Sequence, residues 1–213
     1  MNFTILDCEQ RSEMWFAARC GRLTGSQAAD MLSRIKTGEA AARRDLRTKL
    51  VCERLTGKPQ EDDYISKEMQ RGIDLEATAF GEYEAITGVI VERTGFLSMN
   101  DKMVGCSLDG HVNNFEGIVE FKCPKSATHL KYLRSVGIPS DHYAQCLHNL
   151  WVSGAQWCDF VSYDDRFPAD LQLHVVRMPR VEKDITAYAL AVELFLAEVD
   201  AEVLSVQKLR KAA

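Results

Sequence analysis

Apolar and polar positions follow two different periods along the 213-residue chain. Towards both ends, apolar residues recur at every third or fourth position, which is typical of helices that bury one face. In the middle, short apolar runs of strand length lie between turns rich in glycine, asparagine and aspartate. The pattern predicts an α/β (α+β) fold in which helices flank a central mixed β-sheet.

The same pattern predicts where each element begins and ends. Helices are expected over residues 11–21, 24–34, 39–57, 66–88, 126–137, 140–154 and 181–210. Strands are expected over residues 89–99, 103–110, 117–124, 156–164 and 171–178. Side chains that favour helix starts stand at Ser12 and at Ser140 or Asp141, while Gly57 and Gly88 favour helix ends.

Three local features add detail. The short second helix can begin behind Thr24 or Ser26, because either hydroxyl is able to cap it. The fourth helix contains Gly72, which costs roughly 1 kcal/mol relative to alanine and so predicts close packing at that point. Asn113 and Asn114 supply turn chemistry before the third strand.

Composition limits the class of protein. Without repeats, low-complexity tracts or linkers, the chain is expected to form a single domain over residues 1–213. It has no run of about 18 apolar residues to span a membrane and no secretory signal. Seven scattered cysteines without a CxxC pair favour reduced thiols in a cytoplasm. The formal net charge of −5 does not indicate nucleic-acid binding, although net charge says little about one local groove.

The strand "GIVEFKCP" carries two charges within an apolar run. Side chains two positions apart on a strand point to the same face, so Glu120 and Lys122 stand side by side. Asp109 ends the preceding strand, where a turn brings it beside Glu120. Two carboxylates held this close repel each other unless a cation lies between them, and a hard divalent metal with oxygen ligands suits that place.

The same residues also have a simpler interpretation. A Glu-x-Lys pair on a strand is most often a solvated face with a weak surface ion pair. Glu76 favours the metal centre, because its helix would direct a third carboxylate to the same region if it packs on the sheet. The set then suits a metal-dependent phosphodiesterase, in which the metal polarises a phosphoryl oxygen.

Four blocks of the sequence resemble one nuclease family. "GCSLDG" with "GIVEFKCPKS" resembles the PD-(D/E)xK motif, in the version carried by phage lambda exonuclease and the YqaJ-type viral recombinases. "WFAARCGRLTGSQAADML", "QRGIDLEATA" and "YAQCLHNLWVSGAQWCDFVSYDDRF" resemble further segments of that family. The blocks follow the family order and cover roughly residues 15–165.

The resemblance implies a restriction-endonuclease-like PD-(D/E)xK core and a processive 5′→3′ exonuclease. Such an enzyme degrades linear double-stranded DNA from its ends, releases 5′-mononucleotides and leaves 3′ single strands. By position, Asp109 and Glu120 would ligate Mg²⁺, or Mn²⁺ in its place, with the backbone carbonyl of Phe121 as a further ligand. Lys122 would orient or activate the attacking water, and Glu76 would help to hold a second metal ion or its waters.

The resemblance also implies a pocket for the terminal 5′-phosphate, formed by Arg19, Thr24, Ser26 and Ser107. An arginine fork together with hydroxyls suits a phosphate. Gln145 matches a family glutamine beside the active centre, but Leu147 stands where the family often has a second glutamine. The basic residue that follows Ser26 and reaches the DNA is either Arg34 or Lys36.

The implied partners are DNA ends, a phage single-strand-annealing recombinase and further copies of the chain. Family members form ring-shaped homotrimers that enclose DNA, and the expected setting is the cytoplasm of a bacterial host of a phage or prophage. To reconcile DNA binding with the acidic net charge, we expect a basic lining from the N-terminal half, formed by Arg11, Arg19, Arg22, Arg34, Lys36, Arg43, Arg44 and Arg47.

Three alternatives share parts of this pattern. A restriction or repair endonuclease would use the same metal centre without needing a free DNA end. A catalytically silent DNA-binding module would not need the intact acids and lysine. A Cas4-like nuclease would need four suitably placed cysteines for an iron–sulfur cluster, and Cys8 or Cys20 with Cys146 and Cys158 do not form that pattern.

Overall fold

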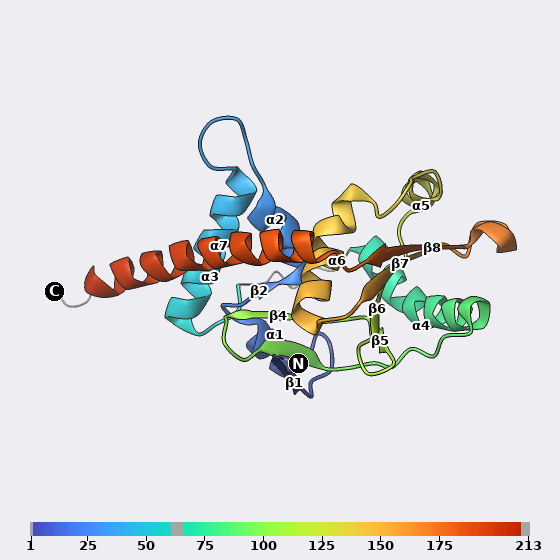
Figure 1. The fold of residues 1–213 in the computed structure, drawn as a ribbon, viewed down its shortest axis with the longest axis horizontal. Coiled ribbons are helices and arrows are strands. Elements are labelled where there is room, and N and C mark those ends of the chain that lie inside the picture. Colours follow the sequence, from blue (N-terminus) through green and yellow to red (C-terminus); the bar gives the residue numbers. More distant parts are fainter. Residues whose placement is uncertain (1, 61–65, 210–213) are drawn as a thin grey trace.

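The computed structural model of the chain describes residues 2–60 and 66–209. Figure 1 shows two sheets joined and flanked by helices. The helices are α1 (Glu13–Arg19), α2 (Ala28–Leu32), α3 (Ala41–Thr56), α4 (Lys67–Thr87), α5 (Ser126–Leu133), α6 (Ser140–Ser153) and α7 (Glu182–Leu209), with 3-10 turns η1 (Gly25–Gln27) and η2 (Ala169–Leu171). The strands are β1 (Phe3–Leu6), β2 (Leu23–Thr24), β3 (Phe96–Met99), β4 (Val104–Cys106), β5 (Gly110–Val112), β6 (Gly117–Lys122), β7 (Trp157–Tyr163) and β8 (Leu173–Pro179).

The strands form two mixed sheets of four strands each, with the orders β1-β3-β4-β2 and β5-β6-β7-β8. One parallel pair occurs in each sheet, β2 with β4 and β6 with β7, and the other pairs are antiparallel. The α/β class with flanking helices is confirmed. The expected central sheet is present as these two sheets, because the predicted strand 103–110 breaks after Cys106 and resumes as β5.

Helix α6 links the two sheets. It contacts β3 and β4 of the first sheet and β6 and β7 of the second, so most of its surface is buried. The buried His148 on it is satisfied at both ring nitrogens, which lie 3.0 Å from the Gly105 carbonyl oxygen and 2.8 Å from the Tyr188 hydroxyl. A helix buried against both sheets places the side chains of its inner face at fixed positions relative to β6.

Helix α4 covers the outer face of the second sheet. The Phe80 ring stacks on Phe121 of β6 with centroids 4.2 Å apart, and Tyr83 meets the same ring edge-on. The Tyr83 hydroxyl donates to Asp159 of β7 over 2.7 Å. The aromatic contacts therefore set the distance between α4 and β6. The predicted site is divided between these two elements, with Glu76 on α4 and with Glu120 and Lys122 on β6.

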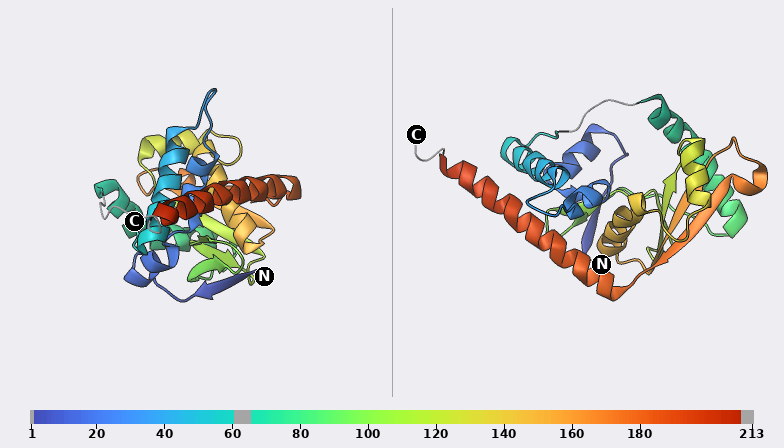
Figure 2. Two further views of the ribbon diagram at one scale, coloured as in Figure 1. Left: turned by 90° about the vertical axis from the view of Figure 1, so that its left-hand side faces the viewer. Right: turned by 90° about the horizontal axis from the view of Figure 1, so that it is seen from above.

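Helices α3 and α7 pack side by side, and α7 extends past the sheets as a long straight helix (Figure 2). This contact corrects the prediction of a basic lining along α3. Arg43 pairs with Glu39 and with Glu198 of α7, and Arg47 pairs with Glu39 and Glu202. These two arginines therefore hold α3 to α7, because their charges already meet carboxylates of the same chain.

Most predicted helix boundaries agree with the structure. Ser12 caps α1 by accepting from the Trp15 amide, and α3 and α4 end at Gly57 and Gly88 in the left-handed conformation. Thr24, rather than Ser26, lies at the N-terminal cap of η1, in a capping box with Gln27.

Other boundaries differ. Pro139 takes the cap position of α6 in place of Ser140 or Asp141. Strand β1 was not predicted, and the expected strand 89–99 is reduced to β3 plus an isolated bridge between Glu92 and His111. Residue 210 of the last predicted helix lies outside the described residues. Across residues 2–60 and 66–209, no helix combines the length and the apolar character that crossing a membrane requires.

Candidate active site

Glu120 occupies the centre of the candidate site. It lies on β6 between α6 and α4 and is 1% exposed. Its Oε1 accepts hydrogen bonds from Lys122 Nζ and, over 2.5 Å, from Gln145 Nε2. Its Oε2 accepts from Asn149 Nδ2 over 3.0 Å. A buried carboxylate with donors on both oxygens has one fixed orientation, which is a requirement for a ligand or a catalytic group.

The two amides come from successive turns of α6. Gln145 and Asn149 are four residues apart and so lie on the same helix face. Asn149 is 1% exposed, and its Oδ1 has no hydrogen-bond partner among the described residues. Gly25 packs directly against that oxygen: a Cβ added at this glycine would lie 2.5 Å from Asn149 Oδ1. Only glycine at residue 25 leaves Asn149 its place beside Glu120.

Asp109 lies in the connection between β4 and β5, next to β6. Its Oδ2 accepts a hydrogen bond from the Phe121 amide over 2.7 Å. The contact fixes the carboxylate at Phe121, the residue whose own carbonyl was predicted to be a metal ligand. The predicted adjacency of Asp109, Glu120 and Lys122 is thus present, although the roles of these residues stay predictions.

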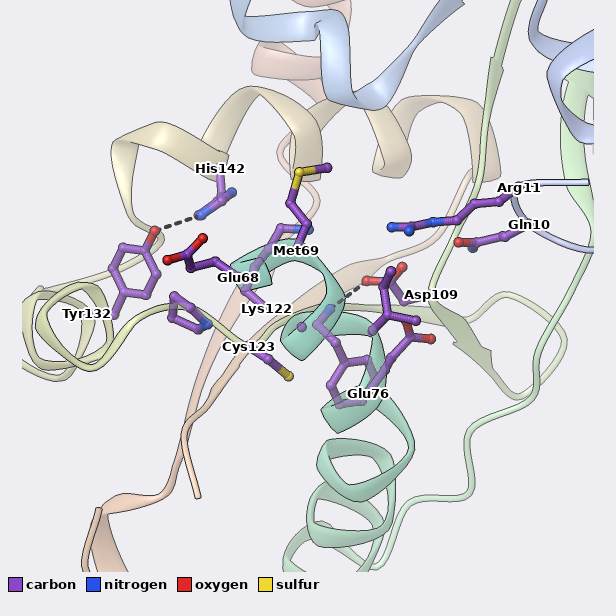
Figure 3. A pocket seen from close by; sticks show the side chains of 14 residues that line it. Gln10, Arg11, Glu68, Met69, Glu76, Asp109, Lys122, Cys123, Tyr132 and His142 are labelled. Atoms are coloured by element: carbon purple, nitrogen blue, oxygen red, sulfur yellow. Dashed lines mark hydrogen bonds between the residues drawn. The ribbon is translucent and has the colours of Figure 1, made fainter. Parts of the chain in front are cut away.

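An open pocket of about 490 Å³ reaches Asp109 and Lys122 (Figure 3). Its walls include Glu76 and Gly72 of α4, Asp109, Lys122, and His142 at the start of α6. A Cβ at Gly72 would meet the Cys123 carbonyl oxygen at 3.7 Å, an ordinary contact, so close packing does not explain this glycine.

Electrostatics in the pocket are dominated by burial and by repulsion among carboxylates. Burial raises the pKa of Glu120 to about 7, with Asp109 and Glu76 adding to the rise and Lys122 opposing it. Burial also raises the pKa of Asp109 and of Glu76. For Lys122, burial acts to lower the pKa, but Glu120 and Asp109 outweigh it and the pKa is raised. In the absence of a metal, Lys122 is therefore an ammonium ion next to carboxyl groups whose pKa values are raised.

This donor set fits a hard divalent cation. Within residues 2–60 and 66–209, no group of three or more His, Cys, Asp and Glu side chains is arranged to hold a metal ion. A cation would therefore rely on the carboxylates of Asp109 and Glu120, completed by a backbone carbonyl such as that of Phe121 and by water. It would relieve the repulsion that raises the pKa of Glu120. The seven cysteines are free thiols, and among the described residues they form no such group either.

The residues predicted to bind a 5′-phosphate are only partly assembled. The Arg19 guanidinium lies 4.1 Å from the centroid of the Trp15 ring, and Trp15 Nε1 donates to Ser107 Oγ over 2.7 Å. Arg19 and Ser107 therefore both contact Trp15. Ser107 lies two residues before Asp109 in the sequence. Thr24 is 1% exposed, and its hydroxyl donates to Gln27 Oε1 over 3.2 Å, so it is not open to solvent.

Ser26 is exposed and lies next to Gly25, beside the amides of α6. Arg34 and Lys36 are exposed on the loop between α2 and α3, outside the pocket that reaches Asp109. The structure does not choose between these two basic residues, and their contact with DNA stays a prediction.

Comparison with known proteins gives the chain a family. Residues 14–156 match the YqaJ-like viral recombinase domain. The chain belongs to this family. The YqaJ-like match contains every residue singled out above for the metal, the amide contacts and the phosphate. No curated protein matches the sequence.

Solved structures extend the likeness over the whole fold of this YqaJ-like domain. An alkaline exonuclease, LHK-Exo, from Laribacter hongkongensis is 37% identical with a TM-score of 0.85, covering 95% of this chain and 100% of that one. LHK-Exo in complex with dAMP is 36% identical with a TM-score of 0.86 and the same coverage. A phage-related exonuclease from Haemophilus somnus 129PT shares the fold, with a TM-score of 0.61 at 13% identity over 85% of this chain and 96% of that one.

Sequence reasoning missed Asn149. It follows Gln145 by four residues on a predicted helix, so the spacing already placed it on the same face. What the sequence could not provide was the position of α6 relative to β6, which depends on tertiary packing. A polar residue at helical spacing from a predicted site residue is the indication that was available.

Proposed function

We propose that this YqaJ-like domain is a Mg²⁺-dependent exonuclease that degrades one strand of linear double-stranded DNA from its ends. It works processively in the 5′→3′ direction, releases 5′-mononucleotides and leaves 3′ overhangs for a single-strand-annealing recombinase. The alkaline exonuclease named for the similar structures supports the nuclease activity, and the complex of that protein with dAMP supports a site for a released nucleotide.

One observation carries the proposal. Glu120 is buried, held by Gln145 and Asn149 on its two oxygens, and paired with Lys122, which lines an open pocket together with Asp109. A purely structural Glu–Lys pair needs neither a second carboxylate nearby nor an opening to solvent. A hydrolytic centre for phosphodiesters needs both.

Each residue then has a chemical task. Asp109 and Glu120 would hold Mg²⁺, which polarises the phosphoryl group and lowers the pKa of water. Gln145 and Asn149 keep Glu120 in one orientation, and Glu76 orders water on the α4 side of the pocket. Lys122, an ammonium ion by its raised pKa, donates hydrogen bonds to the phosphoryl oxygens as negative charge grows on them.

The bond that breaks is set by the product. Water attacks the phosphorus that follows the terminal nucleotide, the bond from phosphorus to the 3′-oxygen breaks, and that oxygen takes up a proton. The released product is a 5′-mononucleotide, and the shortened strand again carries a 5′-phosphate. A phosphate site formed by Arg19, Ser26 and Ser107 would therefore have its ligand after every cycle.

Processivity needs a device that keeps the DNA near the enzyme. We propose a ring-shaped homotrimer around the duplex, with Mg²⁺ as the metal in each subunit and Mn²⁺ able to replace it. Light scattering coupled to size-exclusion chromatography tests the trimer, since the mass should be three times the 24.0 kDa of one chain.

The activity is tested with linear and covalently closed circular duplexes, each with and without Mg²⁺. The expected result is complete digestion of one strand of the linear DNA, faster from 5′-phosphate than from 5′-hydroxyl ends, and no change in the circles. Cutting of the circles would instead identify an endonuclease. Binding of linear DNA without turnover under any divalent metal would identify a catalytically silent module.

A further inference from the structure

Arg11 has an unusual backbone conformation at the wall of the pocket. It lies in the connection between β1 and α1 with a φ of 68°, a left-handed conformation that costs a residue with a Cβ some strain. Its side chain is exposed and borders both the 490 Å³ pocket and an adjoining one of about 320 Å³. In Figure 3 this side chain reaches from its loop towards Asp109.

Arg93 enters the adjoining pocket from the segment before β3. Its guanidinium lies 4.6 Å from the centroid of the Phe80 ring, and its Nη2 is 3.4 Å from Glu76 Oε1. The side chain nevertheless stays 63% exposed. Stacking on Phe80 orients the flat guanidinium while most of it remains open to a ligand.

The two arginines meet at the carboxylates. Both oppose the rise in the pKa of Glu76, and Arg93 also opposes the rise in the pKa of Asp109, so their charges lie close to these acids. Within the described residues, Arg11 has no hydrogen bond or ion pair, and Arg93 has only the long contact to Glu76. Their donor groups are largely unused.

Without free positive charge, the two adjoining pockets would repel a polyanion such as DNA. The walls of the two pockets carry the acids Glu9, Glu68, Glu76 and Asp109. Their cations are Arg11, Arg93 and Lys122, and Lys122 is already paired with Glu120. A DNA strand that enters this space needs positive charge that is free to contact it, and an arginine fork suits the oxygens of a phosphodiester.

We propose that Arg11 and Arg93 form a phosphate subsite for the strand that is cut, and that it binds a backbone phosphodiester adjacent to the scissile one. The subsite rests on the proposed exonuclease function. It is separate from the predicted 5′-phosphate residues, because neither arginine belongs to that set and both line one pocket with Glu76 and Asp109.

The first test compares Arg11→Gln, Arg93→Gln and the double variant with the wild type on a 5′-phosphorylated linear duplex. Each single substitution should raise KM roughly tenfold with little change in kcat, since a charge-assisted hydrogen bond is lost. Arg134→Gln is the matched control, because it removes the same charge from an exposed residue at the end of α5 that lines neither pocket. An equal effect of Arg134→Gln would reduce the result to net charge and overturn the subsite.

The second test locates the phosphate. A neutral methylphosphonate is placed in turn at each of the first phosphodiesters beyond the scissile one, and equilibrium binding is measured with Ca²⁺ in place of Mg²⁺. At one position the neutral linkage should weaken binding by the wild type but not by the double variant. If the loss of affinity caused by the neutral linkage is the same in the wild type and in the double variant at every position, the two changes act independently and the proposed contact is wrong.

A third variant separates binding from folding. Arg11→Gly should weaken DNA binding as Arg11→Gln does, while its melting temperature should not fall, because glycine adopts the left-handed conformation without strain. Unaltered binding by Arg11→Gly would overturn the role of this side chain. If the wild type does not digest linear DNA at all, the proposed function fails instead, whatever the arginine variants do.

Discussion

Two groups of arginines face carboxylates in this molecule, and they do so in opposite ways. On α3, Arg43 and Arg47 are matched by Glu39, Glu198 and Glu202, and the ion pairs fasten α3 to α7. At the pocket, Arg11 and Arg93 lie near Glu76 and Asp109 without neutralising them, since burial still leaves the pKa of both acids raised. Arg43 and Arg47 are thus fully paired with carboxylates of the same chain. At the pocket, the donor groups of Arg11 and Arg93 and the nearby carboxylates remain available to a ligand.

The difference shows that a count of basic residues does not locate a DNA surface. The N-terminal half is rich in arginine, but each arginine that already pairs with a carboxylate contributes little charge to an external ligand. The informative arginines are those whose partners are missing or distant. In this chain they lie at the site where the acids are also incompletely satisfied.

The largest effect is expected from Glu120→Gln. This nearly isosteric change removes the carboxylate that pairs with Lys122 of the pocket and should lower the digestion rate of linear DNA by more than about a thousandfold if Glu120 holds the proposed metal ion. Single-turnover digestion measures the rate. Glu198→Gln on α7 is the control and should leave it unchanged. A comparable loss of digestion rate in Glu120→Gln and Glu198→Gln would mean that Glu120 has no specific role in the reaction.

Asn149→Ala should have the next largest effect. Loss of the amide frees Glu120 Oε2, and Mg²⁺ affinity or activity should fall about tenfold to a hundredfold, as for other residues that orient a ligand. Isothermal titration of Mg²⁺ into the protein without DNA measures the affinity. Ser153→Ala, one turn further along the same buried face, loses hydrogen bonds only with the backbone groups of Asn149 and Ala155 and should keep the wild-type Mg²⁺ affinity. Unchanged Mg²⁺ affinity in Asn149→Ala would remove its positioning role.

The two regions should respond to pH in opposite directions. Burial raises the pKa of Glu120 to about 7, so between about pH 4.5 and 7 the unfolded chain releases this proton first and the metal-free protein loses stability as pH rises. The hydrogen bond from Arg43 lowers the pKa of Glu198, so its stabilisation is present above the unfolded pKa and is lost as pH falls through the folded one.

Denaturant titrations of the metal-free protein across pH 3–8 distinguish these two contributions. In Glu120→Gln the loss of stability towards neutral pH should be smaller than in the wild type, and in Glu198→Gln the loss in acid should be smaller. If Glu120 holds the proposed metal ion, the metal competes with protons for this carboxylate, so the rise in melting temperature with Mg²⁺ should be larger at pH 8 than at pH 6. A stabilisation by Mg²⁺ that does not depend on pH would contradict the raised pKa.

The smallest effect is expected at the saturated arginines. Arg43→Ala should destabilise the fold by about 1 kcal/mol and lower the melting temperature by roughly 2–4 °C, because partly exposed ion pairs contribute little. Its KM for linear DNA should stay at the wild-type value. Arg44→Ala is the stability control, since this side chain is 56% exposed and pairs only with Asp45. A raised KM in Arg43→Ala would restore α3 as a DNA surface.

The sequence was sufficient for features that depend on neighbours in the chain. Ser12, Gly57 and Gly88 fixed helix ends through local capping, and the two-residue period of β6 placed Glu120 beside Lys122. Short-range geometry decides these features, so their residues alone predict them.

Features that depend on packing were not accessible. Strand β1 is a short edge strand whose pairing partner, β3, lies more than ninety residues along the chain, as in the pair of Phe3 with Met99. One partner of Arg43, Glu198, lies on α7 at the other end of the sequence, so the ion pair between α3 and α7 could not be predicted without the fold. Asn149 was missed for a related reason, because only the docking of α6 on β6 brings its amide to Glu120.

Gly25 gives this docking a practical meaning for protein engineering. It touches no substrate in the proposed mechanism, and a library that randomises the loop around it would treat it as a spacer. Even an alanine methyl there would have to displace the Asn149 oxygen, 2.5 Å away. The defect in such variants should first be seen as weaker Mg²⁺ retention in a folded protein, so metal titration is a better screen for this loop than solubility.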